Sequence, residues 1–254
     1  MGDTSHRPRD SSAIVLAAGK GTRMRSPLPK VLHRFRGEPL VVHPVRAALA
    51  AGASRVVVVV GHGANEVVGT LRNAFPEAHD ALCVAEQPKQ LGTGHAVQCA
   101  LPSLSDRSGP VLVLSGDVPL VRVETLSALC EGASRSSAGI ALAIFTPPDT
   151  TGYGRIVRDA NARILRIVEH KDATPEELAI AECNAGLYAI EAEVLRRELP
   201  TLGRANAQGE VYLTDIVARL AGVGDVVGLA VDPLQATGVN SPEELAELEL
   251  RARA

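Results

Sequence analysis

The stretch AIVLAAGKGTRMRSPLPK, residues 13–30, indicates both how the chain folds and what it binds. Its apolar start, residues 13–17, is typical of a β-strand that is buried on both faces of a parallel sheet. The strand leads into Gly19-Lys20-Gly21, where glycines let the backbone approach a ligand and present its N–H groups. The cations Arg23 and Lys30 follow. A strand that ends in a glycine-rich, doubly basic loop predicts a phosphate-binding site, although an isolated loop of this kind is more often an ordinary turn.

Composition narrows the class of protein. The chain has 254 residues, of which 46% are hydrophobic, so we expect one large α/β domain or one domain with an added lobe. A formal net charge of −3 gives no general attraction to nucleic acid or to anionic membranes. Four widely spaced cysteines fit no metal-binding spacing and indicate reduced thiols. With neither a signal peptide nor an apolar run of about 18 residues, the sequence predicts a cytoplasmic protein.

Strand-like and helix-like segments alternate through the first half of the chain. After the opening strand we expect strands at 56–60, 81–85 and 111–114, and helices at 40–51, at 64–75 and from residue 92 onward. This alternation is typical of a parallel sheet with helices on both faces. Right-handed crossovers then gather the loops that follow the strands at one edge of the sheet, where ligands bind.

The second half is richer in strands. We expect strands at 138–145, 183–190 and 226–231, a hairpin from 155–158 and 162–168, and helices beginning at Thr174, Thr214 and Ser241. We therefore interpret residues 1–12 as a flexible segment, 13–240 as a single domain with halves 13–120 and 121–240, and 241–254 as a terminal helix.

Polar residues follow several of the expected strands. Gln87 offers both a donor and an acceptor to the edge of a base. Asp117 closes a hydrophobic strand beside the predicted phosphate loop, which favours a role as a Mg²⁺ ligand over a helix cap. The chain has no G-x-S-x-G nucleophile pattern, no Walker A frame and no complete dinucleotide-binding fingerprint. Covalent catalysis and dinucleotide chemistry are therefore disfavoured.

Eight sequence blocks together resemble a known family. They are LAAGKGTRM (16–24), PKVLH (29–33), QLGTGHA (90–96), GYGRI (152–156), VEHKDA (168–173), QGE (208–210), YLTD (212–215) and GVN (238–240). The chain resembles the sugar-nucleotide pyrophosphorylases, and more specifically the uridyltransferase domain of bacterial N-acetylglucosamine-1-phosphate uridyltransferases. The resemblance implies a Rossmann-like nucleotide-diphospho-sugar transferase fold, with a mixed, mostly parallel sheet flanked by helices. Residues 13–120 would then bind nucleotide and residues 121–240 would bind sugar.

The resemblance also implies a reaction and a role for each matching residue. UTP and N-acetylglucosamine 1-phosphate would give UDP-N-acetylglucosamine and pyrophosphate, with Mg²⁺ as cofactor. The sugar phosphate is already an anion, so it needs no general base to attack the α-phosphorus. The implied residues are Arg23 and Lys30 for catalysis; Leu16, Ala17, Ala18, Gly19, Gln87, Gly92 and Thr93 for the nucleotide; Ser115, Gly154, Glu169, Asn184 and Asn240 for the sugar; and Asp117 with Asn240 for the metal.

The chain departs from the family pattern at two site positions, and it lacks the hexapeptide repeats of the family's bifunctional members. Ser115 stands where the family typically has tyrosine, and Ala185 where it has threonine, so another sugar 1-phosphate such as glucose 1-phosphate, or another nucleotide, is the first alternative. A non-catalytic relative that only binds is the second. Because the sequence carries no hexapeptide repeats, we expect no acetyltransferase activity and a monomer or weak oligomer.

Overall fold

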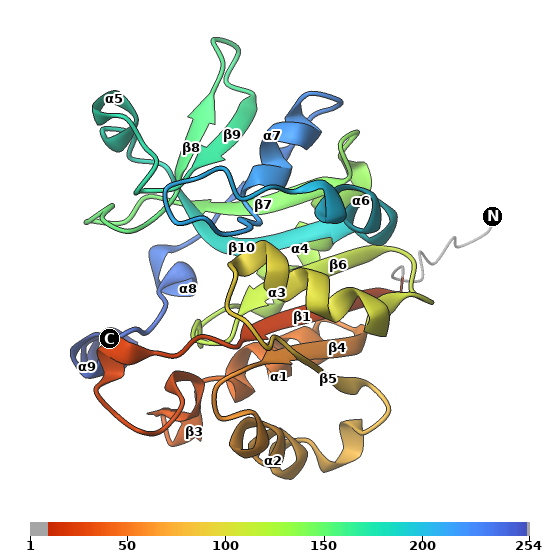
Figure 1. The fold of residues 1–254 in the computed structure, drawn as a ribbon, viewed down its shortest axis with the longest axis vertical. Coiled ribbons are helices and arrows are strands. Elements are labelled where there is room, and N and C mark those ends of the chain that lie inside the picture. Colours follow the sequence, from red (N-terminus) through yellow and green to blue (C-terminus); the bar gives the residue numbers. More distant parts are fainter. Residues whose placement is uncertain (1–9, 253–254) are drawn as a thin grey trace, which may run out of the picture.

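A central sheet organises the computed structural model, which describes residues 10–252 (Figure 1). Its strands follow the order β11-β7-β10-β6-β1-β4-β5. Only β10 runs antiparallel to its neighbours along this path within the described residues. The bounds are β1 Ser11–Ala17, β4 Ala53–Val60, β5 Leu82–Glu86, β6 Pro110–Ser115, β7 Ile140–Phe145, β10 Cys183–Glu191 and β11 Val227–Ala230. The predicted mixed, mostly parallel sheet is confirmed.

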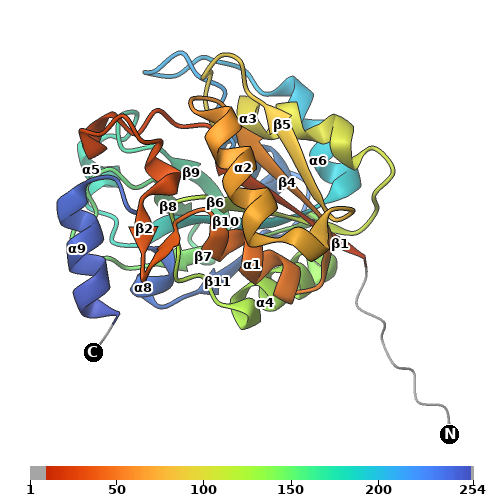
Figure 2. The same cartoon turned by 90° about the horizontal axis from the view of Figure 1, so that it is seen from below.

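Helices cover both faces of this sheet (Figures 1 and 2). On one face α1 (Val42–Ala50), α2 (Ala64–Ala74) and α4 (Val123–Arg135) pack into one apolar cluster. On the other face α3 (Thr93–Ala100), α6 (Ala192–Glu198) and α7 (Asp215–Ala221) pack into a second cluster. In β1, Ala13 and Val15 belong to the first cluster and Ile14 to the second, because successive side chains of a strand point to opposite faces. This arrangement explains why the strand carries an unbroken apolar run.

A hairpin extends the sheet beside β10. Strands β8 (Arg155–Arg158) and β9 (Ile164–Val168) pair antiparallel, as predicted, and β8 also pairs with β10. The Thr174 side chain and the Glu177 side chain form the predicted capping box of α5 (Pro175–Leu178). Other short elements include the paired strands β2 (Arg34–Phe35) and β3 (Glu38–Pro39) and the helix α8 (Pro233–Ala236).

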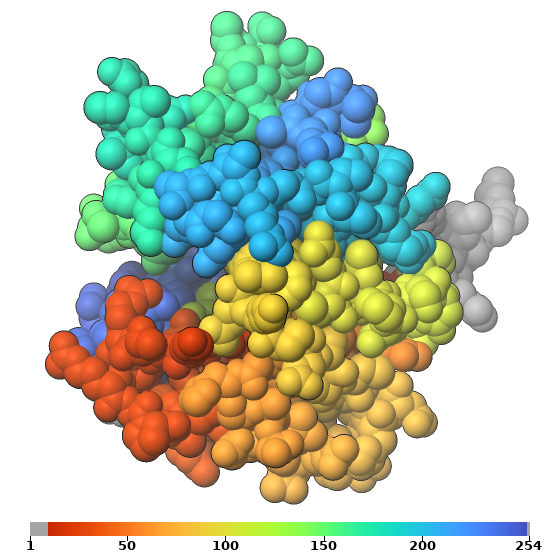
Figure 3. All heavy atoms as spheres, in the orientation of Figure 1, coloured from red at the N-terminus to blue at the C-terminus, as the bar shows by residue number. Residues whose placement is uncertain are grey.

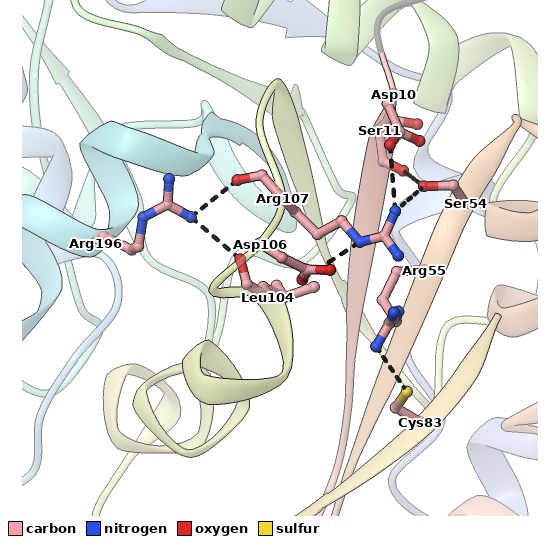
Figure 4. Close-up of polar contacts among 9 residues, drawn as sticks. All are labelled: Asp10, Ser11, Ser54, Arg55, Cys83, Leu104, Asp106, Arg107 and Arg196. Atoms are coloured by element: carbon pink, nitrogen blue, oxygen red, sulfur yellow. Dashed lines mark hydrogen bonds and ion pairs between the residues drawn. The ribbon is translucent and has the colours of Figure 1, made fainter. Parts of the chain in front are cut away.

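The amino end of β1 corrects one prediction. Ser11 and Ser12 are buried and belong to β1, so the flexible segment predicted over residues 1–12 does not include them; residues 1–9 lie outside the described residues. Arg107 anchors this end, because its Nη1 donates to Asp10 Oδ2 at 3.3 Å and to Ser54 Oγ at 3.4 Å (Figure 4). Ser54 Oγ in turn donates to the Ser11 carbonyl at 3.2 Å. Parallel pairing with β4 and β6 holds the strand from both sides.

The carboxyl-terminal helix α9 (Pro242–Arg251) packs against the loop that follows β1 (Figures 1 and 2). Leu248 joins a small apolar cluster with Met24, Phe35, Leu40 and Val239. Ser241 caps the helix, as predicted, by accepting a hydrogen bond from the Glu244 backbone N–H. Among residues 10–252, no helix combines the length and the apolar character that a membrane crossing needs.

Candidate functional site

Two adjoining pockets open at the carboxyl edge of the parallel strands. The first has a volume of about 270 Å³ and the second about 560 Å³. Ser115 and Asp117, at the end of β6 and just beyond it, line both pockets and join them. In the space-filling view the surface is hollowed between the red and yellow segments of the first half and the green and blue segments of the second (Figure 3). The loops predicted to gather at one edge of the sheet therefore do so.

The smaller pocket contains every residue predicted to bind the nucleotide. These residues are Leu16, Ala17, Ala18, Gly19, Gln87, Gly92 and Thr93, and Lys30 lies beside them. Gln87 is 5% exposed, and its Nε2 lies 3.1 Å from both the Gly92 carbonyl and His95 Nδ1. Gln90 Nε2 donates to the Ala18 carbonyl at 2.7 Å and so ties the first loop to the second. Held together in this way, the two loops line one pocket.

The segment 210–213 fixes the loop that contains Gly92 and Thr93. The Val211 N–H donates to the Leu91 carbonyl at 2.8 Å, and the Val211 carbonyl accepts from the Gly94 N–H at 2.8 Å. Thr93 Oγ1 accepts from the Leu213 N–H at 3.1 Å. The sequence blocks QGE and YLTD thus supply a support for the nucleotide loop as well as, through Glu210, part of the pocket wall.

The two basic residues predicted to grip phosphates, Lys30 and Arg23, line different pockets. Gly21 has φ +60°, a left-handed conformation that favours glycine, and a Cβ added there would lie 2.4 Å from the Lys30 Cβ. The loop therefore turns tightly against Lys30, which lines the smaller pocket. Arg23 is exposed and lines the larger pocket. Each pocket is thus lined by one of the two predicted catalytic cations.

Lys30 also connects the two predicted metal ligands. Its Nζ forms a short ion pair with Asp117 Oδ2 and donates to Asn240 Oδ1 at 3.0 Å. Asn240 Nδ2 donates to Glu244 Oε2 at 3.2 Å, which turns the Asn240 carbonyl oxygen toward Lys30. The Val239 N–H donates to the Asp117 carbonyl at 3.0 Å and holds the two segments together.

The donor set of Asp117 and Asn240 fits Mg²⁺. A carboxylate oxygen and an amide oxygen converge on one cationic group, the ammonium of Lys30, which stands between them. In the described part of the chain no three His, Cys, Asp or Glu side chains gather into a metal-binding group. Mg²⁺ in phosphate-handling proteins is held by one or two protein oxygens together with water and substrate phosphates, so a pair of oxygens suffices.

The larger pocket contains every residue predicted to bind the sugar: Ser115, Gly154, Glu169, Asn184 and Asn240. Burial raises the pKa of the Glu169 carboxyl, a hydrogen bond from Thr214 Oγ1 at 2.9 Å lowers it, and the nearby Asp172 and Asp215 raise it further. The Asn184 N–H donates to the Gly154 carbonyl at 2.9 Å, so β10 and the loop before β8 form one continuous wall. This partly apolar, hydrogen-bonding surface suits a sugar ring.

Several lining residues were not predicted as site residues. Gln90 and Glu210 belong to the smaller pocket, and Tyr153, Glu244 and Arg251 to the larger one. Gln90, Tyr153 and Glu210 stand within the sequence blocks that carried the resemblance, so their positions gave a usable signal. Glu244 and Arg251 gave none, because only the packing of α9 brings that helix to the pocket.

Comparisons with known proteins identify the family of this chain. The family model described as the MobA-like NTP transferase domain matches residues 13–185. The bifunctional protein GlmU of Anaeromyxobacter dehalogenans strain 2CP-1 is 53% identical over 235 residues, covering 92% of this chain and 48% of that protein. GlmU of Sorangium cellulosum is 48% identical over 245 residues, covering 96% of this chain and 52% of that protein. The chain thus spans about half the length of the curated relatives it matches.

The fold is also found in a solved structure. The crystal structure of a UDP-glucose pyrophosphorylase complexed with UDP-glucose superposes with a TM-score of 0.75 at 18% identity, covering 96% of this chain and 98% of that one. The predicted Rossmann-like nucleotidyltransferase fold is confirmed. The family model that matches residues 13–185 identifies the class of protein as a nucleotidyltransferase. The chain belongs to the MobA-like NTP transferase family, whose model matches most of its length.

Proposed function

We propose that this chain transfers UMP from UTP to N-acetyl-α-D-glucosamine 1-phosphate, with Mg²⁺ as cofactor, giving UDP-N-acetylglucosamine and pyrophosphate. The observation that carries the proposal is the meeting of the two pockets at Asp117, with Lys30 at the junction. A nucleotide in the smaller pocket and a sugar phosphate in the larger one would bring their phosphates together there. The names of the relatives and the sequence blocks support the choice of UTP and of the acetylated sugar.

The geometry suits a single displacement. An anionic oxygen of the sugar phosphate forms a new bond to the α-phosphorus while the bond from that phosphorus to the bridging oxygen breaks, and pyrophosphate leaves. Lys30 and Arg23 hold the triphosphate and the departing pyrophosphate, since charge builds on those oxygens. Asp117 and Asn240 would hold Mg²⁺, which when bound neutralises charge on the reacting phosphates. Because the attacking oxygen is already ionised, these residues need only align and stabilise.

Glucose 1-phosphate is the second candidate acceptor. Ser115 and Ala185 line the larger pocket at the positions where the family pattern carries a tyrosine and a threonine. Smaller side chains at these places change the room and the hydrogen-bonding groups that a sugar meets.

Pyrophosphate release with UTP and Mg²⁺ tests the proposal, comparing N-acetylglucosamine 1-phosphate, glucose 1-phosphate and no sugar. We expect release with the acetylated sugar and none without sugar. A preference for glucose 1-phosphate would retain the reaction and change the substrate, and no release with either sugar would overturn the proposal.

The Asp117→Asn variant should retain the fold by circular dichroism and lose turnover, because it removes a proposed ligand of Mg²⁺. Unchanged turnover would show that Asp117 is not a metal ligand.

A further inference from the structure

The side chains of Asn184 and Tyr188 meet on β10, although four positions separate them. Asn184 Nδ2 donates to Tyr188 Oη at 2.6 Å. In a regular strand, residues four positions apart are separated by about 13 Å, too far for side chains that stand perpendicular to the sheet to touch. The strand must therefore depart from regular geometry between these two residues.

A bulge in β10 provides that departure. Asn184 pairs opposite Ile144 of β7 and Tyr188 opposite Leu142, so the register of the pair shifts between them. The extra length on β10 bends the strand and leaves Ala185 and Gly186 facing the larger pocket. Gly186 has φ +70°, which glycine adopts without strain. The bulge thus turns an otherwise straight strand into part of the pocket wall.

The bulge also fixes which way the Asn184 amide points. The Gly186 N–H donates to Asn184 Oδ1 at 3.0 Å, while Asn184 Nδ2 donates to Tyr188 Oη. A flipped amide would put its NH₂ group against the Gly186 N–H and lose that hydrogen bond, so Gly186 sets the orientation of the amide, while Tyr188 Oη holds its other end in place. One amide N–H and one carbonyl lone pair remain for a ligand, and Asn184 lines the larger pocket.

Tyr188 itself stays in the core. It is 3% exposed and belongs to the apolar cluster on one face of the sheet. Burial raises the pKa of its phenol, as does the negative charge of nearby Glu169, while the hydrogen bond from Asn184 lowers it. The hydroxyl therefore keeps its proton around neutral pH, and its oxygen remains available to accept from Asn184.

We propose that Tyr188 is a positioning residue for sugar recognition: from the core, its hydroxyl anchors the Asn184 amide at the place where the sugar ring meets it. This inference rests on the proposed function, because it takes Asn184 as a contact of the sugar 1-phosphate. Tyr188→Phe keeps the ring in the core and removes only the acceptor. The amide of Asn184 then loses one of its two anchors and samples orientations that do not suit the sugar.

Steady-state kinetics of Tyr188→Phe test the inference. We expect the KM for the sugar 1-phosphate to rise about tenfold and the KM for UTP to stay unchanged. A tenfold change corresponds to the loss of about one hydrogen bond. Partial unfolding of the variant would lower the apparent kcat and leave both KM values as they are, so this pattern separates positioning from instability.

A double substitution shows whether Tyr188 acts through Asn184. In the Asn184→Ala background, adding Tyr188→Phe should leave the sugar KM unchanged. A further rise in that background, an unchanged sugar KM in the single variant, or an equal rise in the KM for UTP would each overturn the inference.

Calorimetry separates failure of this inference from failure of the proposed function. Tyr188→Phe should weaken binding of UDP-N-acetylglucosamine about tenfold and leave binding of UDP unchanged. Wild-type protein that neither turns over nor binds the UDP-sugar more tightly than UDP would overturn the proposed function. Normal wild-type behaviour with an unaffected Tyr188→Phe variant would overturn the positioning role alone.

Discussion

Under the proposed function, Lys30 and Mg²⁺ would compete for the same oxygens. Its ammonium contacts both Asp117 and Asn240, and its side chain is 15% exposed. A divalent cation bound between these oxygens would displace the ammonium, which would then be free to turn toward the triphosphate. We therefore propose that Lys30 holds the two oxygens together until nucleotide and metal bind.

Lys30→Met should therefore bind Mn²⁺ several-fold more tightly than the wild type in the absence of substrates, as measured by electron paramagnetic resonance. Its turnover should fall about a hundredfold, because the reacting phosphates lose a cation. Lys20→Met removes the same charge from the exposed part of the same loop and should leave Mn²⁺ affinity unchanged. Weaker or unaltered Mn²⁺ binding by Lys30→Met would show that Lys30 does not occupy the metal position.

Glu169 makes stability depend on pH. Burial, as the largest cause, raises the pKa of Glu169 above its ordinary value of 4.5. The folded state then binds this proton more tightly than the unfolded state, so the contribution of Glu169 to stability is greatest below pH 4.5 and falls as pH rises through the raised pKa.

Glu169→Gln removes the buried charge and keeps an oxygen that accepts from Thr214. The variant should be more stable than the wild type at pH 8, and the difference should shrink toward pH 4, as followed by urea unfolding at each pH. If the difference in the free energy of unfolding stays constant over this pH range, burial does not raise the pKa of the Glu169 carboxyl.

At the scale of elements, α9 is part of the domain and of the site. Leu248, 1% exposed, packs in the apolar cluster with Met24 and Phe35, and Asn240 and Glu244 connect the start of the helix to Lys30. The sequence predicted this helix as a separate terminal segment. The predicted domain boundaries stay a prediction, but the packing shows that α9 shares a core with the loop after β1.

Leu248→Ala should lower the free energy of unfolding by about 2–4 kcal/mol, because it leaves a cavity in this small core. Leu250→Ala lies on the same helix at a position that is 69% exposed, and should change stability by no more than about 0.5 kcal/mol. Chemical denaturation of both variants makes the comparison. Equal effects would indicate that α9 is not docked through Leu248.

Elements differed in how well the sequence predicted them. The buried strands β1, β4 and β6 were found because their apolar runs have one structural interpretation. Helix α4 was missed, although Leu126, Leu129 and Ala133 repeat at helical spacing, because a glycine, a cysteine and two serines between residues 127 and 134 dilute the pattern. The bulge in β10 offered one sequence signal, Gly186 within a largely apolar strand, but the register shift itself is set by pairing with β7.

At the scale of the whole molecule, the site depends on contacts between distant parts of the chain. The sequence blocks predicted which residues line the pockets. Many of these residues are glycines or polar residues in loops, which an apolar core does not require. The contact of Lys30 with Asp117, 87 positions away, and with Asn240, 210 positions away, required the fold. Glu210 lines the smaller pocket and Arg23 the larger one, so each pocket draws on both halves of the chain.

This arrangement leads to our central claim: a sugar phosphate held in the larger pocket attacks the α-phosphorus of a nucleotide in the smaller pocket directly, with no covalent intermediate on the protein. The most direct test is the stereochemistry at that phosphorus, using UTP that carries a single chiral sulfur on the α-phosphate. One in-line displacement predicts inverted configuration in the UDP-sugar product. Retained configuration would require two displacements through an intermediate on the protein, and would contradict the account.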